Sequence, residues 1–286
     1  MTEISEIGVV GAGFMGSGIA ESAARAGIVA HVFEPDEAPL RRSREGIEAS
    51  VARRVRGGKL EAPAARELVE RVHWTSDLDE LGSSEIVVEA IVEDEAAKVE
   101  VFRALDELVG DKAILASNTS SIPIAGLAAA TSRPDRVVGL HFFSPVPVMK
   151  LVEIVVALET ADATVATVEG FARQMGKTPI HTKDRSGFIV NMLLVPYLMA
   201  AVRMYADDFA TREDIDDGMK LGCAHPMGPL ELCDFIGLDV LYSVCNSLYD
   251  EFKGHEYAPP PLLKRMVVMG HLGRKTGRGF YEYPTS

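Results

Sequence analysis

Apolar and polar positions alternate along the first part of the chain in a pattern that predicts strands separated by helices. Short apolar runs predict strands over residues 7–10, 29–33, 86–88, 113–116, 136–143 and 149–156. Stretches with helical patterning predict helices over residues 15–26, 37–56, 61–72 and 98–109. This alternation is typical of a mainly parallel sheet with helices on both faces. We therefore predict a doubly wound α/β domain over residues 1–185.

The pattern changes close to residue 185. Beyond this point, four segments have helical patterning: residues 189–206, 211–221, 229–251 and 260–270. Only residues 280–283 suggest a strand. We therefore predict an all-α domain over residues 186–286, with the boundary between the two domains within residues 183–188.

A glycine-rich turn follows the first predicted strand and opens the first predicted helix. Residues 11–16 read Gly-Ala-Gly-Phe-Met-Gly, the G-x-G-x-x-G pattern of Rossmann-like dinucleotide-binding domains. Its glycines allow a tight turn, a close approach of the backbone to a pyrophosphate, and close packing of helix on strand. Glu34 ends the second strand, where a carboxylate binds ribose hydroxyls and repels a 2′-phosphate. The turn predicts a site for NAD rather than NADP; a glycine-rich turn without a ligand is the alternative.

His141 and Glu153 form a candidate acid–base pair. His141 ends an apolar strand, which is where ligands bind in such sheets. Alternation in the next strand puts Leu151, Glu153 and Val155 on one face, and a carboxylate on an apolar face needs a partner. We expect Glu153 to orient His141 as a general base. A structural salt bridge between Glu153 and a Lys or Arg is the alternative.

Three further polar side chains are candidates for ligand binding. Asn118 and Ser120 follow the strand 113–116, at the ligand edge of the predicted sheet. Ser121 is expected to be the N-cap of a following helix. Asn191 interrupts an apolar run, and we expect its amide to bind either a ligand carbonyl or the protein backbone.

Composition and charge exclude several classes of protein. A chain with 47% hydrophobic and 25% charged residues is expected to fold. A formal charge of −13 argues against nucleic acid or anionic membrane as general partners. Three cysteines without a Cys-x-x-Cys pair argue against a disulfide framework or a zinc ribbon, so we expect no metal. With no signal-peptide pattern and no long apolar run, a cytoplasmic location is expected.

The acidic chain nevertheless contains a basic segment. Seven of the nineteen residues 41–59 are Arg or Lys, including Arg53, Arg54 and Arg56. The ordinary interpretation is a solvated helix face with some charge pairing. The alternative is an anchor for a polyanionic ligand such as coenzyme A.

Blocks of sequence along nearly the whole chain carry a family resemblance. They are Gly-Ala-Gly-Phe-Met-Gly-Ser-Gly at 11–18, Val-Glu-Ala-Ile-Val-Glu at 88–93, Ser-Asn-Thr-Ser-Ser at 117–121, His-Phe-Phe-Ser-Pro-Val-Pro-Val-Met-Lys-Leu-Val-Glu at 141–153, Gly-Phe-Ile-Val-Asn at 187–191, His-Pro-Met-Gly-Pro-Leu-Glu-Leu at 225–232 and Gly-Arg-Lys-Thr-Gly-Arg-Gly-Phe-Tyr at 273–281. On these blocks the chain resembles the short-chain L-3-hydroxyacyl-CoA dehydrogenases, a family that includes bacterial 3-hydroxybutyryl-CoA dehydrogenases.

The resemblance implies an NAD-dependent oxidoreductase that interconverts an L-3-hydroxyacyl-CoA and the 3-ketoacyl-CoA. It implies a catalytic set, which consists of His141, Glu153, Ser120 and Asn191. It adds cofactor contacts to the glycine loop and Glu34, namely Phe14, Met15, Ala90, Ile91, Glu93, Lys98, Asn118 and Lys275. A homodimer formed through the C-terminal domain is implied as well.

The chain departs from the usual residues of the family at four positions, namely Gly57, Ser144, Ser186 and Met192. These departures leave the preferred acyl length open. A dehydrogenase of a non-CoA hydroxy acid, such as a sugar acid, and a non-catalytic NAD sensor are the alternative functions.

Overall fold

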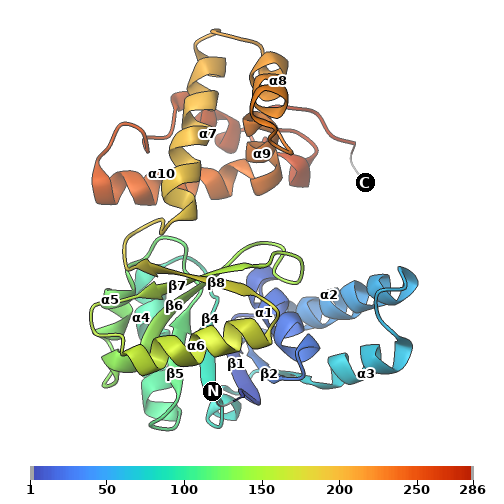
Figure 1. Ribbon diagram of the computed structural model, residues 1–286, viewed down its shortest axis with the longest axis vertical. Coiled ribbons are helices and arrows are strands. Elements are labelled where there is room, and N and C mark those ends of the chain that lie inside the picture. Colours follow the sequence, from blue (N-terminus) through green and yellow to red (C-terminus); the bar gives the residue numbers. More distant parts are fainter. Residues whose placement is uncertain (1–2, 285–286) are drawn as a thin grey trace. The chain divides into compact units, whose positions relative to one another are not determined.

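The structure is a computed structural model that describes residues 3–284. The chain divides into two compact units, one ending at Arg185 and the other beginning at Ser186. Figure 1 shows sheet and helices in the first unit and helices in the second.

One eight-stranded sheet organises the first unit. Its strands are β1 (Glu6–Val10), β2 (Val29–Phe33), β3 (Val72–Thr75), β4 (Ile86–Glu89), β5 (Ile114–Ser117), β6 (Val137–Phe142), β7 (Leu151–Val156) and β8 (Thr178–Lys183). They lie in the order β3-β2-β1-β4-β5-β6-β7-β8, and every neighbouring pair is parallel except β6 and β7. The prediction of a doubly wound, mainly parallel sheet is confirmed.

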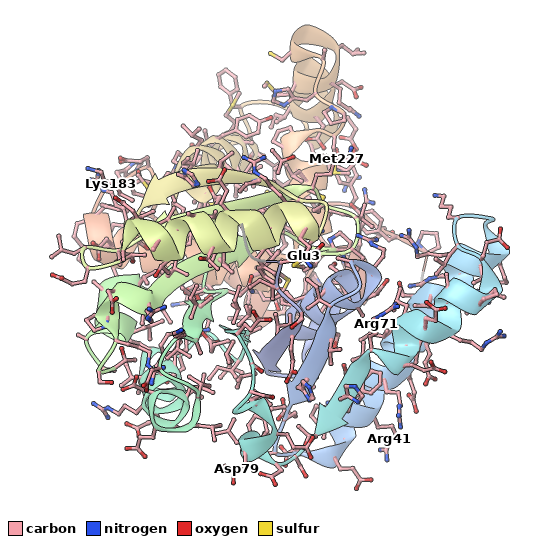
Figure 2. All side chains as sticks on the ribbon, turned by 60° about the horizontal axis from the view of Figure 1, so that its bottom comes forward. Glu3, Arg41, Arg71, Asp79, Lys183 and Met227 are labelled. Carbon is pink, nitrogen blue, oxygen red and sulfur yellow. The ribbon has the colours of Figure 1, made fainter. Side chains whose placement is uncertain are left out.

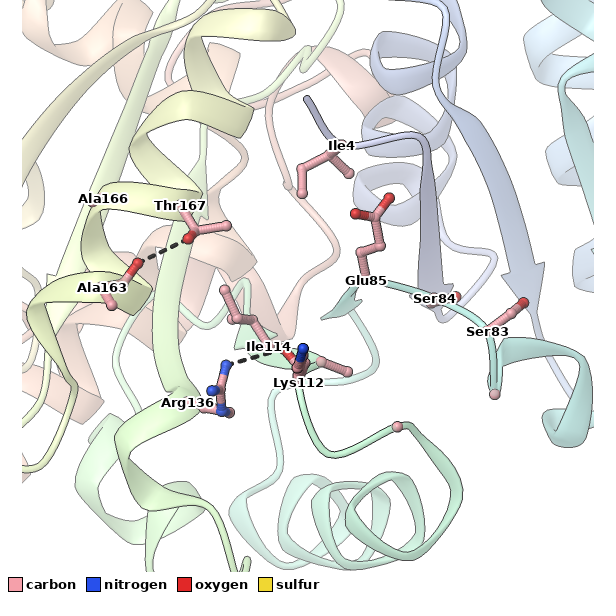
Figure 3. Close-up of a pocket in the computed structure, with 13 residues that line it drawn as sticks. Ile4, Ser83, Ser84, Glu85, Lys112, Ile114, Arg136, Ala163, Ala166 and Thr167 are labelled. Atoms are coloured by element: carbon pink, nitrogen blue, oxygen red, sulfur yellow. Dashed lines mark hydrogen bonds between the residues drawn. The ribbon is translucent and has the colours of Figure 1, made fainter. Parts of the chain in front are cut away.

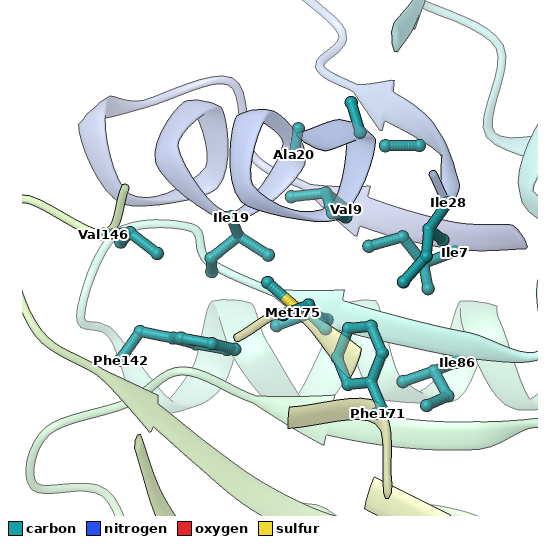
Figure 4. Packing of buried hydrophobic residues seen from close by; sticks show 14 of the residues in the cluster. Ile7, Val9, Ile19, Ala20, Ile28, Ile86, Phe142, Val146, Phe171 and Met175 are labelled. Carbon is teal, nitrogen blue, oxygen red and sulfur yellow. The ribbon is translucent and has the colours of Figure 1, made fainter. Parts of the chain in front are cut away.

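Helices cover both faces of this sheet. They are α1 (Phe14–Arg25), α2 (Glu37–Arg56), α3 (Ala62–Glu70), α4 (Glu95–Leu108), α5 (Ile124–Ala128) and α6 (Asp162–Gln174), with 3₁₀ turns η1 (Leu78–Leu81) and η2 (Pro134–Arg136). On one face, Ile7 and Val9 of β1 pack with Ile19 of α1 and Phe171 of α6 (Figure 4). Because strand side chains alternate, Val87 and its counterparts on neighbouring strands face the other side.

Several elements differ from the predictions. The predicted helix over residues 61–72 ends at Glu70, and Val72–Thr75 forms the edge strand β3. Neither α6 nor β8 was predicted. Residues 178–183 are largely polar and only partly buried, so they lack the pattern of a buried strand. An edge strand with one solvated face lacks the continuous apolar run that identifies a buried strand.

The second unit is helical, as predicted. It contains α7 (Val190–Ala206), α8 (Arg212–Cys223), α9 (Pro229–Ile236), α10 (Leu238–Phe252), α11 (Pro261–Val268) and the 3₁₀ turn η3 (Arg274–Thr276). The single helix predicted over residues 229–251 is wrong, because Gly237 has a φ of 102° and separates α9 from α10. Residues 280–283 form no regular strand, and only an isolated bridge joins Arg278 to Glu282. Within residues 3–284, none of the helices is both long and apolar enough to cross a membrane.

Candidate active site

The parallel strands bring the glycine turn, Glu34 and Asn118 to one edge of the sheet. Carboxyl ends of β1, β2, β4 and β5 point the same way, so the residues that follow them share an edge. Gly11 follows β1, Glu34 follows β2, and Asn118 follows β5.

The glycine turn has the space that a dinucleotide needs. Gly11 has a φ of 106°, and a Cβ on Gly16 would lie 1.9 Å from the Gly11 carbonyl oxygen. A Cβ on Gly13 would meet nothing within 4 Å, so the backbone is open there. Helix α1 begins without a side-chain cap or an acidic residue in its first turn, which leaves its N–H groups to an anionic ligand.

Glu34 reaches back to this turn. Its Oε2 accepts a hydrogen bond of 3.2 Å from the Ala12 N–H. The carboxylate therefore lies beside the turn that would hold the pyrophosphate, where a ribose diol can be bound. The residues present fit NAD.

A buried network supports the loop after β4. Glu89 is fully buried, its Oε1 lies 2.5 Å from Lys98 Nζ, and its Oε2 accepts from the Ser117 hydroxyl at 2.6 Å. Glu89 also accepts the Ile91 N–H at 2.8 Å and so holds the turn at residues 90–91. Lys98, only 1% exposed, also pairs with Glu93 at 3.3 Å.

Glu93 organises the Ser-Asn-Thr-Ser-Ser loop. Its Oε1 accepts hydrogen bonds from the Thr119 hydroxyl at 2.5 Å, the Ser120 N–H at 2.9 Å and the Ser121 hydroxyl at 3.1 Å. Burial opposes ionisation of this carboxyl, but Lys98 and the donated hydrogen bonds outweigh burial and lower the pKa of Glu93. Neighbouring Asn118 accepts the Phe142 N–H at 3.0 Å, which ties the loop to the end of β6.

The prediction that Ser121 caps the next helix is wrong. Helix α5 begins at Ile124 with Pro123 in the cap position, and the Ser121 hydroxyl binds Glu93 instead. The N–H groups at the start of α5 are accepted by Asp184, at 2.8 Å from Ile124 and 2.7 Å from Ala125. A carboxylate sixty residues away in the sequence has taken the role of the local hydroxyl.

His141 and Glu153 are direct partners across the antiparallel pair β6–β7. Nδ1 of His141 lies 2.7 Å from Oε2 of Glu153, and Glu153 is fully buried while His141 is 5% exposed. The ring of Phe143 lies 4.6 Å from the imidazole and shields it.

Ser120 completes a line of three groups. Its Oγ lies 3.2 Å from Nε2 of His141, on the side of the ring opposite Glu153. A carboxylate at Nδ1 keeps the proton on that nitrogen, so Nε2 presents its lone pair towards Ser120. This arrangement can accept a proton at Nε2 and stabilise the resulting imidazolium.

A cavity of about 550 Å³ lies beside the glycine turn. Its lining includes Ser50 and Arg53 of α2, Glu21 of α1, and the loop residues 145–148. Arg54 and Arg56 of the same segment are not among the lining residues. Arg41, labelled in Figure 2, is exposed near the start of α2.

A second cavity, of about 660 Å³, lies at the opposite edge of the sheet. Figure 3 shows it between the amino ends of strands and helix α6, with Ile4, Glu85, Lys112 and Arg136 among its lining residues. It contains none of the predicted site residues.

Two predicted site residues belong to the second unit. Asn191 is half-buried in the first turn of α7. Lys275 lies in η3, with its Nζ 2.6 Å from the Asp239 carboxylate. Across residues 3–284, no group of three or more His, Cys, Asp or Glu side chains could hold a metal ion.

The sequence predictions missed some of the groups around the site. Glu89, the end of an apolar strand, carried a detectable signal, because a charge in a buried strand needs a partner. Ser50, which lines the cavity, carried no such signal, because its neighbours are brought to it only by the packing of distant elements.

Family models match both units of the chain. Residues 6–185 match the 3-hydroxyacyl-CoA dehydrogenase NAD binding domain, and residues 187–283 match the C-terminal domain of the same family. A "3-hydroxybutyryl-CoA dehydrogenase" of Mycobacterium tuberculosis is 52% identical over 98% of this chain and 99% of that protein.

Solved structures agree. The crystal structure of FadB2 from M. tuberculosis superposes with a TM-score of 0.97 at 52% identity, covering 99% of this chain and 100% of the other. That of (S)-3-hydroxybutyryl-CoA dehydrogenase from Ralstonia eutropha gives 0.93 at 43% identity, with coverage of 99% and 100%. The chain therefore belongs to the 3-hydroxyacyl-CoA dehydrogenase family, with an NAD-binding domain followed by the family's C-terminal domain.

Proposed function

We propose that the protein interconverts an L-3-hydroxyacyl-CoA, with 3-hydroxybutyryl-CoA as the first candidate, and the 3-ketoacyl-CoA, acetoacetyl-CoA. The observation that carries this proposal is the line Glu153–His141–Ser120 at the sheet edge beside the glycine turn. The names of the M. tuberculosis and R. eutropha relatives support the choice of substrate.

His141 is the proposed general base and acid. Its Nε2 takes the proton of the substrate hydroxyl during oxidation and returns a proton to the ketone during reduction. Glu153 holds the Nδ1 proton and stabilises the imidazolium, because a buried carboxylate 2.7 Å away acts strongly in a site with little water. NAD, when bound, supplies the hydride acceptor.

Ser120 and Asn191 are the proposed positioning groups for the substrate oxygens. The hydroxyl of Ser120 already faces Nε2 of His141, so an oxygen held by Ser120 lies within reach of the base. Asn191 is assigned on the family resemblance, and its amide can donate to a carbonyl oxygen.

Most of the proposed NAD contacts lie in the first unit, at the carboxyl edge of the sheet, and Lys275 of the second unit is assigned on the family resemblance. Glu93 and Lys98 form one unit there, because Lys98 is buried against Glu93 and Glu89 and acts through the position of Glu93. The full set is Gly11, Gly13, Phe14, Met15, Gly16, Glu34, Ala90, Ile91, Glu93, Lys98, Asn118, Ser120, His141 and Lys275.

The cavity of about 550 Å³ is the proposed site of the coenzyme A moiety. Arg53 and the hydroxyl of Ser50 line it and can meet phosphate and amide oxygens. Arg54 and Arg56 lie nearby on α2 and add positive charge around the site.

A homodimer through the second unit and a cytoplasmic location are part of the proposal. Exposed apolar side chains on the helices of that unit favour an interface there, as illustrated by Leu193 of α7, which is 72% exposed.

A serine hydrolase also uses a line of carboxylate, imidazole and hydroxyl. In this site the Ser120 N–H is donated to the Glu93 carboxylate at 2.9 Å. A negative charge beside the nucleophile opposes the oxyanion that hydrolysis would form. This contact favours a dehydrogenase over a hydrolase.

The test is the consumption of NADH with acetoacetyl-CoA, free acetoacetate, a keto sugar acid and longer 3-ketoacyl-CoA esters, each repeated with NADPH. We expect fast turnover only with the CoA esters and NADH, and no release of free thiol. Turnover of a free acid would identify a non-CoA dehydrogenase. Tight NADH binding without turnover would identify a sensor, and thiol release would identify a hydrolase.

A further inference from the structure

The loop between β6 and β7 forms one wall of the cavity beside the glycine turn. Pro145, Val146, Pro147 and Val148 all line this cavity. The loop packs tightly on α1, where a Cβ on Gly18 would lie 3.0 Å from Cβ of Val146. The wall therefore rests on the helix that starts at the dinucleotide turn.

This loop has few hydrogen bonds of its own. Prolines at 145 and 147 have no N–H to donate, and the N–H groups of Val148 and Met149 both go to the Pro145 carbonyl. None of the loop's own N–H groups is donated to the carbonyls of Val146, Pro147 or Met149.

Two cations, the buried Lys177 and the half-buried Arg25, supply donors to these carbonyls. Lys177, just before β8 and 6% exposed, donates from its ammonium to the carbonyls of Val146 and Met149, the latter at 2.9 Å. Arg25, at the end of α1, donates from Nη1 to the Pro147 carbonyl at 3.0 Å. The loop is thus bound on three carbonyls by side chains from two elements far away in the sequence.

The network continues to the helix that faces the loop across the cavity. Glu21 of α1 is 4% exposed, lies close enough to Arg25 to interact with its charge, and accepts the Ser50 hydroxyl of α2 at 2.9 Å. Ser50 and Glu21 both line the cavity. Lys177, Arg25 and Glu21 therefore connect the wall formed by the loop with the wall formed by α2.

An ammonium in this position has a free-energy cost. Burial lowers the pKa of Lys177 to about 8, and Arg25 adds to this effect while Glu21 opposes it. An apolar side chain would fill the same space without this cost, but it could not bind two carbonyls. The observation favours a role for Lys177 in fixing the shape of the loop.

We propose that Lys177, assisted by Arg25, is a positioning residue for acyl-CoA, because it holds residues 145–149 in the shape that receives the ligand. The inference rests on the proposed function, in which this cavity binds the CoA ester. A preformed wall avoids ordering the loop on binding, so its loss weakens substrate binding more than it slows the chemical step.

The experiment compares Lys177→Met with the wild type and with Lys112→Met, a matched change at an exposed lysine on the opposite sheet edge. We expect KM for acetoacetyl-CoA to rise by about tenfold or more in Lys177→Met, with kcat within about threefold and NADH affinity unchanged. Binding of free CoA, measured by calorimetry, should weaken in parallel. Lys177→Arg, which keeps the charge and several donors, should recover part of the loss.

Four outcomes overturn the inference. An unchanged KM in Lys177→Met shows that the wall does not depend on this residue. An equal loss of kcat, NADH affinity and thermal stability shows a general structural role. If Lys177→Met does not fold, Arg25→Met removes the Pro147 contact and the positive charge near Glu21 but keeps Lys177 in place, and an unchanged KM in that variant overturns the inference. A wild type that turns over no CoA ester refutes the proposed function, and the inference with it.

Discussion

Two carboxylates at the sheet edge, the buried Glu89 and the partly exposed Glu93, are each held by several partners. Glu89 meets an ammonium, a hydroxyl and an N–H, and Glu93 meets an ammonium and the donors of residues 119–121. A buried charge is tolerated only when such partners replace water. In this protein the partners are also the groups that position the loop bearing Ser120.

At the residue scale, His141 is the group whose removal should affect the chemical step most. We expect His141→Ala to lower kcat by roughly 10² to 10⁴, the usual contribution of a general acid–base group. NADH affinity should fall far less than kcat, because His141 is only one of the proposed cofactor contacts and the glycine turn and Glu34 remain in place. Steady-state kinetics and NADH fluorescence titration measure the two quantities. Near-normal turnover would remove His141 from the catalytic role.

At the element scale, strand direction and register position the site. Parallel strands bring Gly11, Glu34 and Asn118 to one edge although they are far apart in sequence. The antiparallel pair β6–β7 sets His141 opposite Glu153. A slip of one residue in that pair would turn Glu153 to the other face of the sheet and break the contact.

Helix α1 packs closely on the glycine turn because Gly16 has no side chain. We expect Gly16→Ala to weaken NADH binding by about tenfold or more, because a Cβ 1.9 Å from the Gly11 carbonyl oxygen must push the helix away from the turn. Fluorescence titration with NADH measures the loss.

Gly218→Ala is the matched control, since its Cβ meets nothing within 4 Å and Gly218 lies inside α8. This variant should keep its NADH affinity and gain roughly 0.5–1 kcal/mol in unfolding free energy, the usual benefit of Ala over Gly in a helix. Equal NADH affinities in the two variants would contradict the role of Gly16.

At the scale of the whole molecule, Lys177 links stability to pH. Its pKa of about 8 in the folded protein lies below the ordinary lysine pKa of 10.5, so between these values the unfolded chain binds a proton that the folded chain has released. The free energy of unfolding of the wild type should therefore rise relative to Lys177→Met as pH increases from 8 towards 10.5, by at most about 1.4 kcal/mol per pH unit.

Urea unfolding of both proteins at pH 7.5 and pH 10 measures this difference. Titration of the other groups is common to both chains and cancels. A stability difference that stays constant with pH would place the Lys177 pKa outside this interval.

Local pattern predicted some features of this molecule well and others poorly. The strand before Gly11 and the helix after it follow from a short apolar run and a glycine turn, which act within a few residues. The split at Gly237 was missed, because helical patterning continues across it while the backbone needs a positive φ. The prediction of a cap at Ser121 was wrong, because Asp184, directly after β8, accepts the N–H groups at the start of α5.

The sequence by itself determined the fold class, the dinucleotide turn and the placement of His141 and Glu153 on neighbouring strands, because periodicity and turn chemistry are local. Only the tertiary structure decided which groups surround the buried charges. It placed the Glu93 carboxylate against the Ser120 N–H, and the Lys177 ammonium against a carbonyl of the loop 145–149. It also placed Ser50 across the cavity from that loop. These contacts join elements far apart in sequence, and strand order and packing, which no local pattern encodes, bring them within hydrogen-bond distance.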